Sequence, residues 1–158
     1  MPRVNPQRAS SVIFDIDGTI TNLDHLLKFI DGSQPKDWDL FTATMSDDSI
    51  NVPVVQVLLA MRAQGFDILL VTGRREQFST VTMDWMDMRH IPYAALFMRK
   101  EGDDREVSLV KRDLLVDVHD AGWDPKTVFE AGAACVDMWR AEGLTCLQVA
   151  ANLDYAIS

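Results

Sequence analysis

The chain has 158 residues, of which 47% are hydrophobic and 25% are charged, and its formal net charge is −9 at pH 7. This length and composition predict one soluble globular domain and exclude a disordered tail, and no apolar run is long enough to cross a bilayer. The acidic excess argues against a module that binds long nucleic acids non-specifically, because such binding needs many Lys and Arg. The negative net charge is still compatible with a nucleic-acid end or a nucleotide as substrate, because a local binding site needs only a few cations.

One folded unit is expected over residues 11–150. It follows a loose N-terminal arm (1–10) without the pattern of a secretory signal, and it precedes a C-terminal tail (151–158). Cys135 and Cys146 lack the spacing of metal ligands and are expected to be buried thiols in a reducing, cytoplasmic environment. The sequence predicts no particular oligomeric state.

The first predicted strand, residues 12–16, ends in an unusual way. Its β-branched and aromatic residues are typical of a strand buried on both faces of a parallel sheet, yet it contains Asp15 and leads into Asp17, Gly18 and Thr19. An unpaired buried carboxylate is costly, so Asp15 needs a cation or donors beside it, or a position where the strand opens into a cleft. A pair of aspartates near a glycine more commonly serves only to cap the end of a strand. The polar motifs in the rest of the chain make this capping explanation weaker.

Residues 22–51 form an insert after this strand. Apolar spacing from Asn22 to Ile30 predicts a short amphipathic helix, and a connector rich in Gly, Ser, Pro and Asp follows over 31–51. A connector of this length is often a lid or a substrate-facing loop. We expect its Trp38 and Phe41 to pin the loop onto the core rather than to stack on nucleic-acid bases. The insert therefore predicts a small cap or none.

Helices and strands alternate along the remaining chain. Apolar periodicity predicts helices over 53–64, 76–90, 106–121 and 133–142, and strands over 66–72, 94–98, 127–130 and 144–149. This alternation predicts an α/β fold of three layers, a Rossmann-like parallel sheet with helices on both faces. Ligands of such sheets bind beyond the carboxyl ends of the strands.

Polar residues gather at those predicted strand ends. Thr72, Gly73 and Arg74 form a predicted glycine turn after the second strand, and Glu130 ends the fourth. Lys111 lies at the centre of the apolar arc of helix 106–121. Either its stem runs along the core and its head reaches solvent, or its ammonium contacts an anion over the sheet, and the nearby carboxylates favour the second interpretation.

This order of motifs resembles the haloacid dehalogenase-like (HAD) phosphohydrolases over nearly the whole chain. The matching motifs are Asp15-Ile16-Asp17-Gly18-Thr19, Thr72-Gly73-Arg74, Lys111 and the acidic residue that ends the fourth strand. Further segments, residues 38–39, 93–99, 110–112 and 136–140, are similar to the phosphatase half of phage and bacterial polynucleotide kinase-phosphatases. The chain contains no GxxxxGK[ST] loop, the phosphate-binding motif of the kinase half.

The resemblance implies a role for each motif residue. Asp15 is the implied nucleophile, which forms an aspartyl-phosphate, and Asp17 is the implied general acid and then base. Thr72 and the backbone N–H of Gly73 are expected to hold phosphoryl oxygens while Lys111 neutralises charge.

The resemblance also implies a cofactor and a set of phosphate contacts. Mg²⁺ is expected to bind Asp15, the backbone carbonyl of Asp17 and Glu130, because hard cations prefer oxygen ligands. The residues implied in binding substrate phosphate are Gly18, Thr19, Gly73, Arg74 and Arg99, with Arg105 as a further candidate.

One motif departs from the family pattern. Where the family carries two consecutive aspartates followed by arginine, this chain has Glu130-Ala131-Gly132. Glu130 can still bind a metal directly or through water, whereas Ala131 offers no ligand, and losing such a partner typically costs about 10 to 100-fold in metal affinity or activity.

Two functions from different classes follow. The first is a Mg²⁺-dependent phosphomonoesterase that acts on a polynucleotide 3′-phosphate or a nucleotide. The second is a degenerate member that binds a nucleotide or a protein partner with weak or no turnover. A plain structural domain would need five polar residues to converge by accident.

Overall fold

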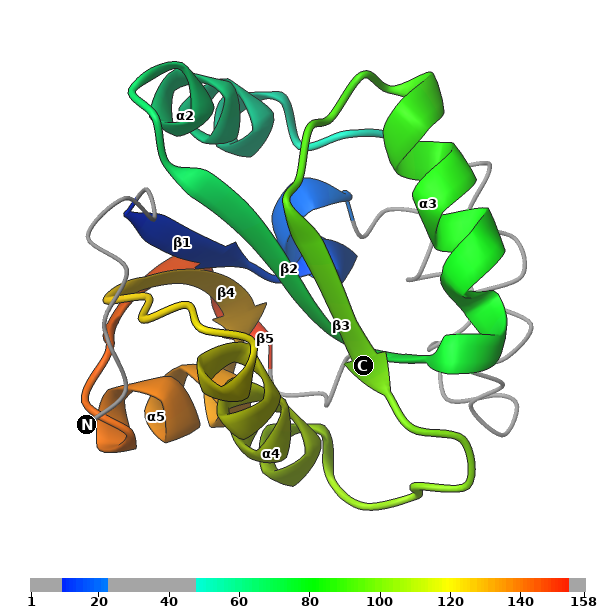
Figure 1. Ribbon diagram of the computed structural model, residues 1–158, viewed down its shortest axis with the longest axis vertical. Coiled ribbons are helices and arrows are strands. Elements are labelled where there is room, and N and C mark those ends of the chain that lie inside the picture. Colours follow the sequence, from blue (N-terminus) through cyan, green and yellow to red (C-terminus); the bar gives the residue numbers. More distant parts are fainter. Residues whose placement is uncertain (1–9, 23–47, 154–158) are drawn as a thin grey trace.

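The computed structural model describes residues 10–22 and 48–153 (Figure 1). The predicted N-terminal arm up to residue 9, the helix predicted from Asn22 onward and the connector with Trp38 and Phe41 lie outside the described residues, apart from Asn22 itself and residues 48–51. The two described ranges meet at an antiparallel bridge between Thr21 and Ile50. Within these ranges, no helix combines the length and the apolar character needed to span a bilayer.

Five parallel strands form one sheet in the order β3-β2-β1-β4-β5. The strands are β1 (Ser11–Phe14), β2 (Asp67–Arg75), β3 (Ala95–Arg99), β4 (Thr127–Gly132) and β5 (Thr145–Leu153). The central strand, β1, is fully covered because its side chains alternate between the two faces of the sheet: Ile13 belongs to one buried cluster, and Val12 and Phe14 belong to the other. The predicted parallel α/β sheet is confirmed.

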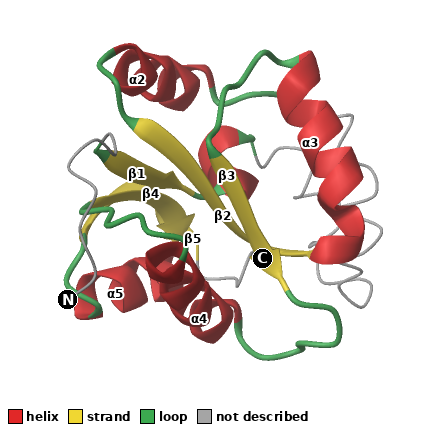
Figure 2. Ribbon diagram, in the orientation of Figure 1, coloured by secondary structure: helices red, strands yellow, loops and turns green. Residues whose placement is uncertain are grey.

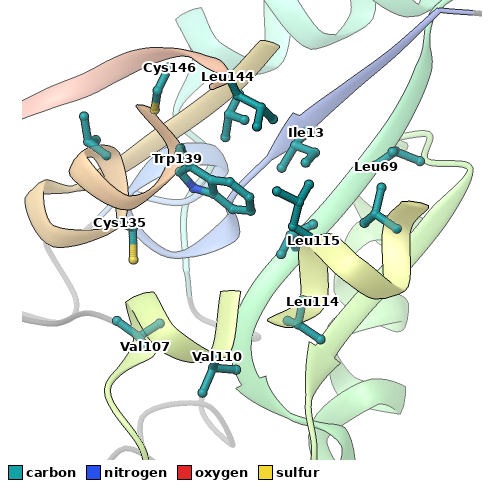
Figure 3. Close-up of a cluster of buried hydrophobic side chains, with 14 residues drawn as sticks. Ile13, Leu69, Val107, Val110, Leu114, Leu115, Cys135, Trp139, Leu144 and Cys146 are labelled. Carbon is teal, nitrogen blue, oxygen red and sulfur yellow. The ribbon is translucent and has the colours of Figure 1, made fainter. Parts of the chain in front are cut away.

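In the described ranges, α-helices cover both faces of this sheet (Figure 2). They are α2 (Val52–Ala63), α3 (Ser79–Met88), α4 (Val107–Asp120) and α5 (Ala133–Ala141). Side chains from α2 and α3 pack on one face, and side chains from α4 and α5 pack on the other. Figure 3 shows the second cluster, in which Trp139 of α5 lies among Ile13, Leu144 and Leu115.

Two strands, β2 and β5, run three or more residues past their predicted ends. β2 continues to Arg75 instead of ending at Thr72, and its pairing with β3 shifts register between Thr72 and Arg75. Gly73 therefore lies inside a strand irregularity, and the predicted glycine turn at this position is wrong. The pairing of Arg75 with Arg99 keeps the strand going. β5 ends at Leu153, beyond the predicted end at residue 149.

The thiols of Cys135 and Cys146 are buried in the cluster of Figure 3. Burial raises the pKa of each thiol from 9.0 to about 12. The unfolded chain loses these protons at lower pH than the folded chain does. The contribution of the two thiols to the free energy of unfolding is therefore complete below the unfolded pKa, and it is lost as the pH rises through the folded pKa.

We therefore expect the urea midpoint to fall between about pH 8 and about pH 11, with a smaller fall in a variant that carries alanine at both cysteines. Equal falls in the two proteins would show that the thiols do not contribute.

Candidate active site

Asp15 and Asp17 leave the C-terminal end of β1 in a tight turn. The backbone N–H of Asp15 donates to the carbonyl of Phe129 in β4 (3.0 Å), which continues the sheet by one residue. The turn Ile16–Ile20 follows, and Gly18 has a φ of 78° there, a conformation that costs glycine little. The Thr19 hydroxyl donates to Oδ2 of Asp15 (3.0 Å). Gly18 and Thr19 thus shape the turn that presents the two carboxylates.

Lys111 of α4 reaches across the sheet to this turn. Its ammonium lies 2.6 Å from Oδ1 of Asp15 and 2.7 Å from Oε2 of Glu130, and all three side chains are buried. The interpretation in which the ammonium contacts an anion is therefore confirmed. A helix position that points at the sheet places this lysine over the end of β1, as its position in the apolar arc indicates.

Asp17 is held by a buried arginine. Arg74 Nε donates to Oδ2 of Asp17 (2.8 Å), and its Nη2 contacts Oδ1 of the same carboxylate. A second carboxylate, Asp48, lies 3.7 Å from the same guanidinium. The planar fork of Arg74 thus meets Asp17 in the two-point manner that arginine favours. Sequence reasoning missed Asp48, and the only signal for it is the acidic pair at residues 47–48.

Glu130, two residues before the end of β4, accepts four donors. Lys111 and the indole N–H of Trp139 (3.2 Å) donate to Oε2. The backbone N–H groups of Ala131 and Gly132 donate to Oε1, each at 3.0 Å. Sequence reasoning also missed Trp139, since an aromatic residue on a helix is most often explained by packing alone.

The site carries an excess of negative charge. In the part of the chain that the structure describes, four buried carboxylates, Asp15, Asp17, Asp48 and Glu130, face two buried cations, Lys111 and Arg74. Burial, and next the charge of Glu130, raise the pKa of Asp15 well above 3.8. Burial alone would lower the pKa of Lys111, but Asp15 and Glu130 raise it well above 10.5, so the ammonium stays charged.

The other predicted site residues lie on the β2 and β3 side. Thr72 is fully buried, and its hydroxyl accepts the backbone N–H of Arg74 (3.2 Å). The register pairs Phe14 with Leu70, so Thr72 lies two residues further along β2, level with the turn after β1. This places Thr72 beside the carboxylates.

Arg99 and Arg105 contact groups of the loop after β3 and of the elements beside it. Arg99 Nε donates to the carbonyl of Gly73 (2.8 Å), and its Nη1 donates to the carbonyls of Asp103 (2.9 Å) and Arg105 (2.7 Å). The exposed Arg105 pairs with Asp103 (2.7 Å) and Asp113 (2.9 Å). Arg99 thus ties the loop after β3 to Gly73 of β2, and Arg105 ties the same loop to Asp113 of α4. The predicted contact of both arginines with substrate phosphate stays a prediction.

The donor set does not fit a Mg²⁺ ion held by Asp15, Asp17 and Glu130. Glu130 has its oxygens occupied by four donors, and residue 131 is alanine. Among residues 10–22 and 48–153, no three His, Cys, Asp or Glu side chains come together as a metal-binding group. The carboxylate of Glu130 contacts Lys111, Trp139 and the backbone in this structure, and its predicted role as a metal ligand stays a prediction.

Comparisons with known proteins agree with this architecture. The family described as the polynucleotide kinase PNKP phosphatase domain matches residues 9–154. Two solved structures titled Pnkp1/Rnl/Hen1 complexes, one of them an RNA repair complex, share 27% and 28% identity, with TM-scores of 0.78 and 0.76. They cover 96% and 92% of this chain, which spans 45% and 47% of theirs.

A class C acid phosphatase from Bacillus anthracis with tungstate bound has a TM-score of 0.61 at 13% identity over 80% of this chain and 54% of that one, a likeness of fold alone. The parallel sheet, with paired aspartates after its central strand and a lysine above them, defines a phosphatase domain of the HAD-like superfamily. Within that class the chain belongs to the family of polynucleotide kinase PNKP phosphatase domains. Phosphatases of the superfamily generally use Mg²⁺.

Proposed function

We propose that this domain removes the phosphoryl group from the 3′ end of a nucleic acid by nucleophilic attack of Asp15. The contact between Asp15 and Lys111 (2.6 Å) is the observation that carries the proposal. It places a buried carboxylate oxygen beside a fixed positive charge at the carboxyl end of the sheet, where an incoming phosphate would meet both. Burying two charges costs several kcal/mol per ion before their attraction is counted. The desolvation cost therefore argues against a purely structural role for this ion pair.

The reaction would run in two displacements. Asp17 would enter the first step protonated and released from Arg74. An oxygen of ionised Asp15 attacks phosphorus, the bond from phosphorus to the ester oxygen breaks, and Asp17 gives its proton to the leaving alkoxide. Asp17 then takes a proton from water, the water oxygen attacks phosphorus, and the bond from phosphorus to Asp15 breaks. Free phosphate leaves, and both carboxylates return to their starting states.

The neighbouring groups have assigned parts in this scheme. Lys111 lies beside the nucleophile and would offset charge on the transferring group, while Thr72 and the backbone N–H of Gly73 would hold its oxygens. Both oxygens of Asp17 contact Arg74, so one of these contacts must give way before Asp17 can meet the leaving oxygen. Arg74 would then be available to the substrate phosphate, the contact predicted from the sequence.

The choice of substrate is supported by the family and by the solved relatives. The family is named for polynucleotide kinase, and one of the similar structures is an RNA repair complex. The net charge of −9 favours a substrate held by its end over one held along its length, since contacts along the backbone would need many cations.

Phosphate release from three substrates tests this proposal: a 3′-phosphorylated oligonucleotide, the same oligonucleotide phosphorylated at its 5′ end, and a 3′-mononucleotide. We expect the 3′-phosphorylated oligonucleotide to give the highest kcat/KM, with phosphate release lost in Asp15→Asn. Equal release by the wild type and Asp15→Asn would rule out the proposed nucleophile. A higher kcat/KM for the mononucleotide would be compatible with nucleophilic attack by Asp15 and would contradict a polynucleotide 3′ end as the substrate.

A second candidate is a family member that binds a nucleotide or protein partner without turnover. It is favoured by Ala131, which replaces an expected carboxylate, and by the full occupation of Glu130. Robust turnover of any phosphomonoester would dispose of it, whereas binding of a 3′-phosphorylated oligonucleotide without phosphate release would favour it over the first proposal.

A further inference from the structure

We propose that Glu130 is a positioning residue for Lys111, that Trp139 fixes it in this role, and that the end of β4 supplies no metal ligand in this chain. The inference concerns the contacts of Glu130 and does not require the domain to turn over a substrate. It departs from the assignment that the sequence motif implied, in which Glu130 binds Mg²⁺.

The carboxylate of Glu130 has no acceptor capacity left in the arrangement seen here. An ionised carboxylate offers about four lone-pair sites, and four donors lie at 2.7, 3.0, 3.0 and 3.2 Å from its two oxygens. A cation could bind there only by displacing the Lys111 ammonium, the indole N–H or two backbone N–H groups. A displaced indole or backbone N–H would be left buried without a partner, at a cost of about 1–3 kcal/mol, and Lys111 would keep only its contact with Asp15.

The backbone contacts fix one oxygen independently of the lysine. Ala131 and Gly132 are the last two residues of β4, directly before α5, and both of their N–H groups point at Oε1. Glu130 is thereby folded back onto its own strand end, with Oε2 turned toward Lys111. A carboxylate held in this way can orient the Lys111 ammonium, but it is not free to turn and coordinate a metal ion.

Trp139 secures the other oxygen from the helix. Its indole is fully buried in the cluster that Figure 3 shows, and its N–H donates to the same oxygen that receives Lys111. Because close packing holds a buried indole in one orientation, this hydrogen bond keeps Oε2 in place when the lysine meets a substrate. The chain Trp139, Glu130, Lys111, Asp15 then links the packed core to the nucleophile.

Residue 131 removes the remaining ligand from this strand end. Ala131 is buried and directly follows Glu130, and its methyl group cannot coordinate a cation. Divalent cation binding in the wild type then depends on groups of the β1 turn and on water, so we expect it to be weak. Introducing a carboxylate with Ala131→Asp should tighten Mn²⁺ binding by about 10-fold or more.

Mn²⁺ binding measured by electron paramagnetic resonance tests the metal part without any turnover. We compare the wild type, Ala131→Asp, and Ala131→Asp combined with Glu130→Gln, after checking by circular dichroism that each is folded. The inference expects Ala131→Asp to tighten binding and Glu130→Gln to leave the tightened constant within about 3-fold. It is overturned if Ala131→Asp gives no tighter binding, or if Glu130→Gln weakens binding by about 10-fold or more, as removal of a ligand would.

The indole N–H of Trp139 reports on Glu130 directly. The chain has four tryptophans, and Trp139→Phe assigns the Trp139 signal among the four indole resonances in a ¹H–¹⁵N spectrum. The resonance should shift in Glu130→Gln and should stay in place when Mg²⁺ is titrated into the wild type. A large shift on Mg²⁺ addition would mean that the metal takes Glu130 from Trp139, which contradicts the inference.

Trp139→Phe also separates positioning from packing. Phenylalanine keeps an aromatic ring in the cluster and removes the indole N–H that contacts Oε2 of Glu130. If turnover is found, we expect kcat to fall about 10-fold with KM nearly unchanged, because Lys111 would be held less firmly beside Asp15. An unchanged kcat in a folded Trp139→Phe would remove Trp139 from the proposed chain of contacts.

Discussion

Replacing Lys111 with methionine is expected to lower the free energy of unfolding by about 3–5 kcal/mol, measured by urea denaturation at neutral pH. The ammonium is buried and contacts Asp15 at 2.6 Å and Glu130 at 2.7 Å. Methionine fits a similar volume but leaves two buried carboxylates without their shared cation, and the site already has more carboxylates than cations. Uncompensated buried charge is among the few causes of so large an effect from one substitution.

Two further variants show whether charge is the cause. Adding Glu130→Gln to Lys111→Met removes one of the stranded charges and should recover part of the lost stability. Lys100→Met is the matched surface control, since Lys100 pairs with Glu76 at 2.9 Å while its side chain is 66% exposed. Such a pair contributes little, so a change within about 0.5 kcal/mol is expected. Similar losses in Lys111→Met and Lys100→Met would contradict the buried ion cluster.

Replacing Asp15 with asparagine is expected to reduce phosphate release by about 1,000-fold or more, because the amide cannot form the covalent intermediate. The same change should leave the thermal midpoint unchanged or raise it. Burial and the charge of Glu130 raise the pKa of Asp15 well above 3.8, so the folded protein disfavours the ionised form and a neutral side chain of the same shape relieves that cost.

Asp124→Asn is the control for this substitution. Asp124 is exposed and contacts Lys126 at 2.8 Å, away from the strand ends that carry the site. It should change neither phosphate release nor the thermal midpoint. If Asp15→Asn instead unfolds the domain, the carboxylate serves the fold, and the functional assignment of Asp15 loses its basis.

The elements of the fold could be predicted because each has a local signal. Continuous apolar runs indicate β1 and β2, and apolar residues at helical spacing indicate α2 and α4. The convergence of Asp15 and Lys111 could also be predicted, because a lysine at the centre of an apolar arc has to point at the sheet. Parallel strands then place their ends at one edge, which puts Glu130 near the same point.

The contacts that distinguish this site had no local signal. Asp48 and Arg74 are 26 residues apart in the chain, and only the folded arrangement brings them within 3.7 Å. The hydrogen bond of Trp139 to Glu130 depends on how α5 packs against β4. The turn predicted at Gly73 was wrong because pairing with β3 continues past it, and strand pairing is a long-range property.

Detection of a phosphorylated Asp15 tests the central claim most directly. The wild type is mixed with a 3′-phosphorylated oligonucleotide, quenched in acid within the first turnover, reduced with borohydride and mapped by peptide mass spectrometry. We predict modification of Asp15 in the peptide that carries Asp15 and Asp17, and its loss in Asp15→Asn. Phosphate release without modification of Asp15, or with modification of another residue, would contradict the account.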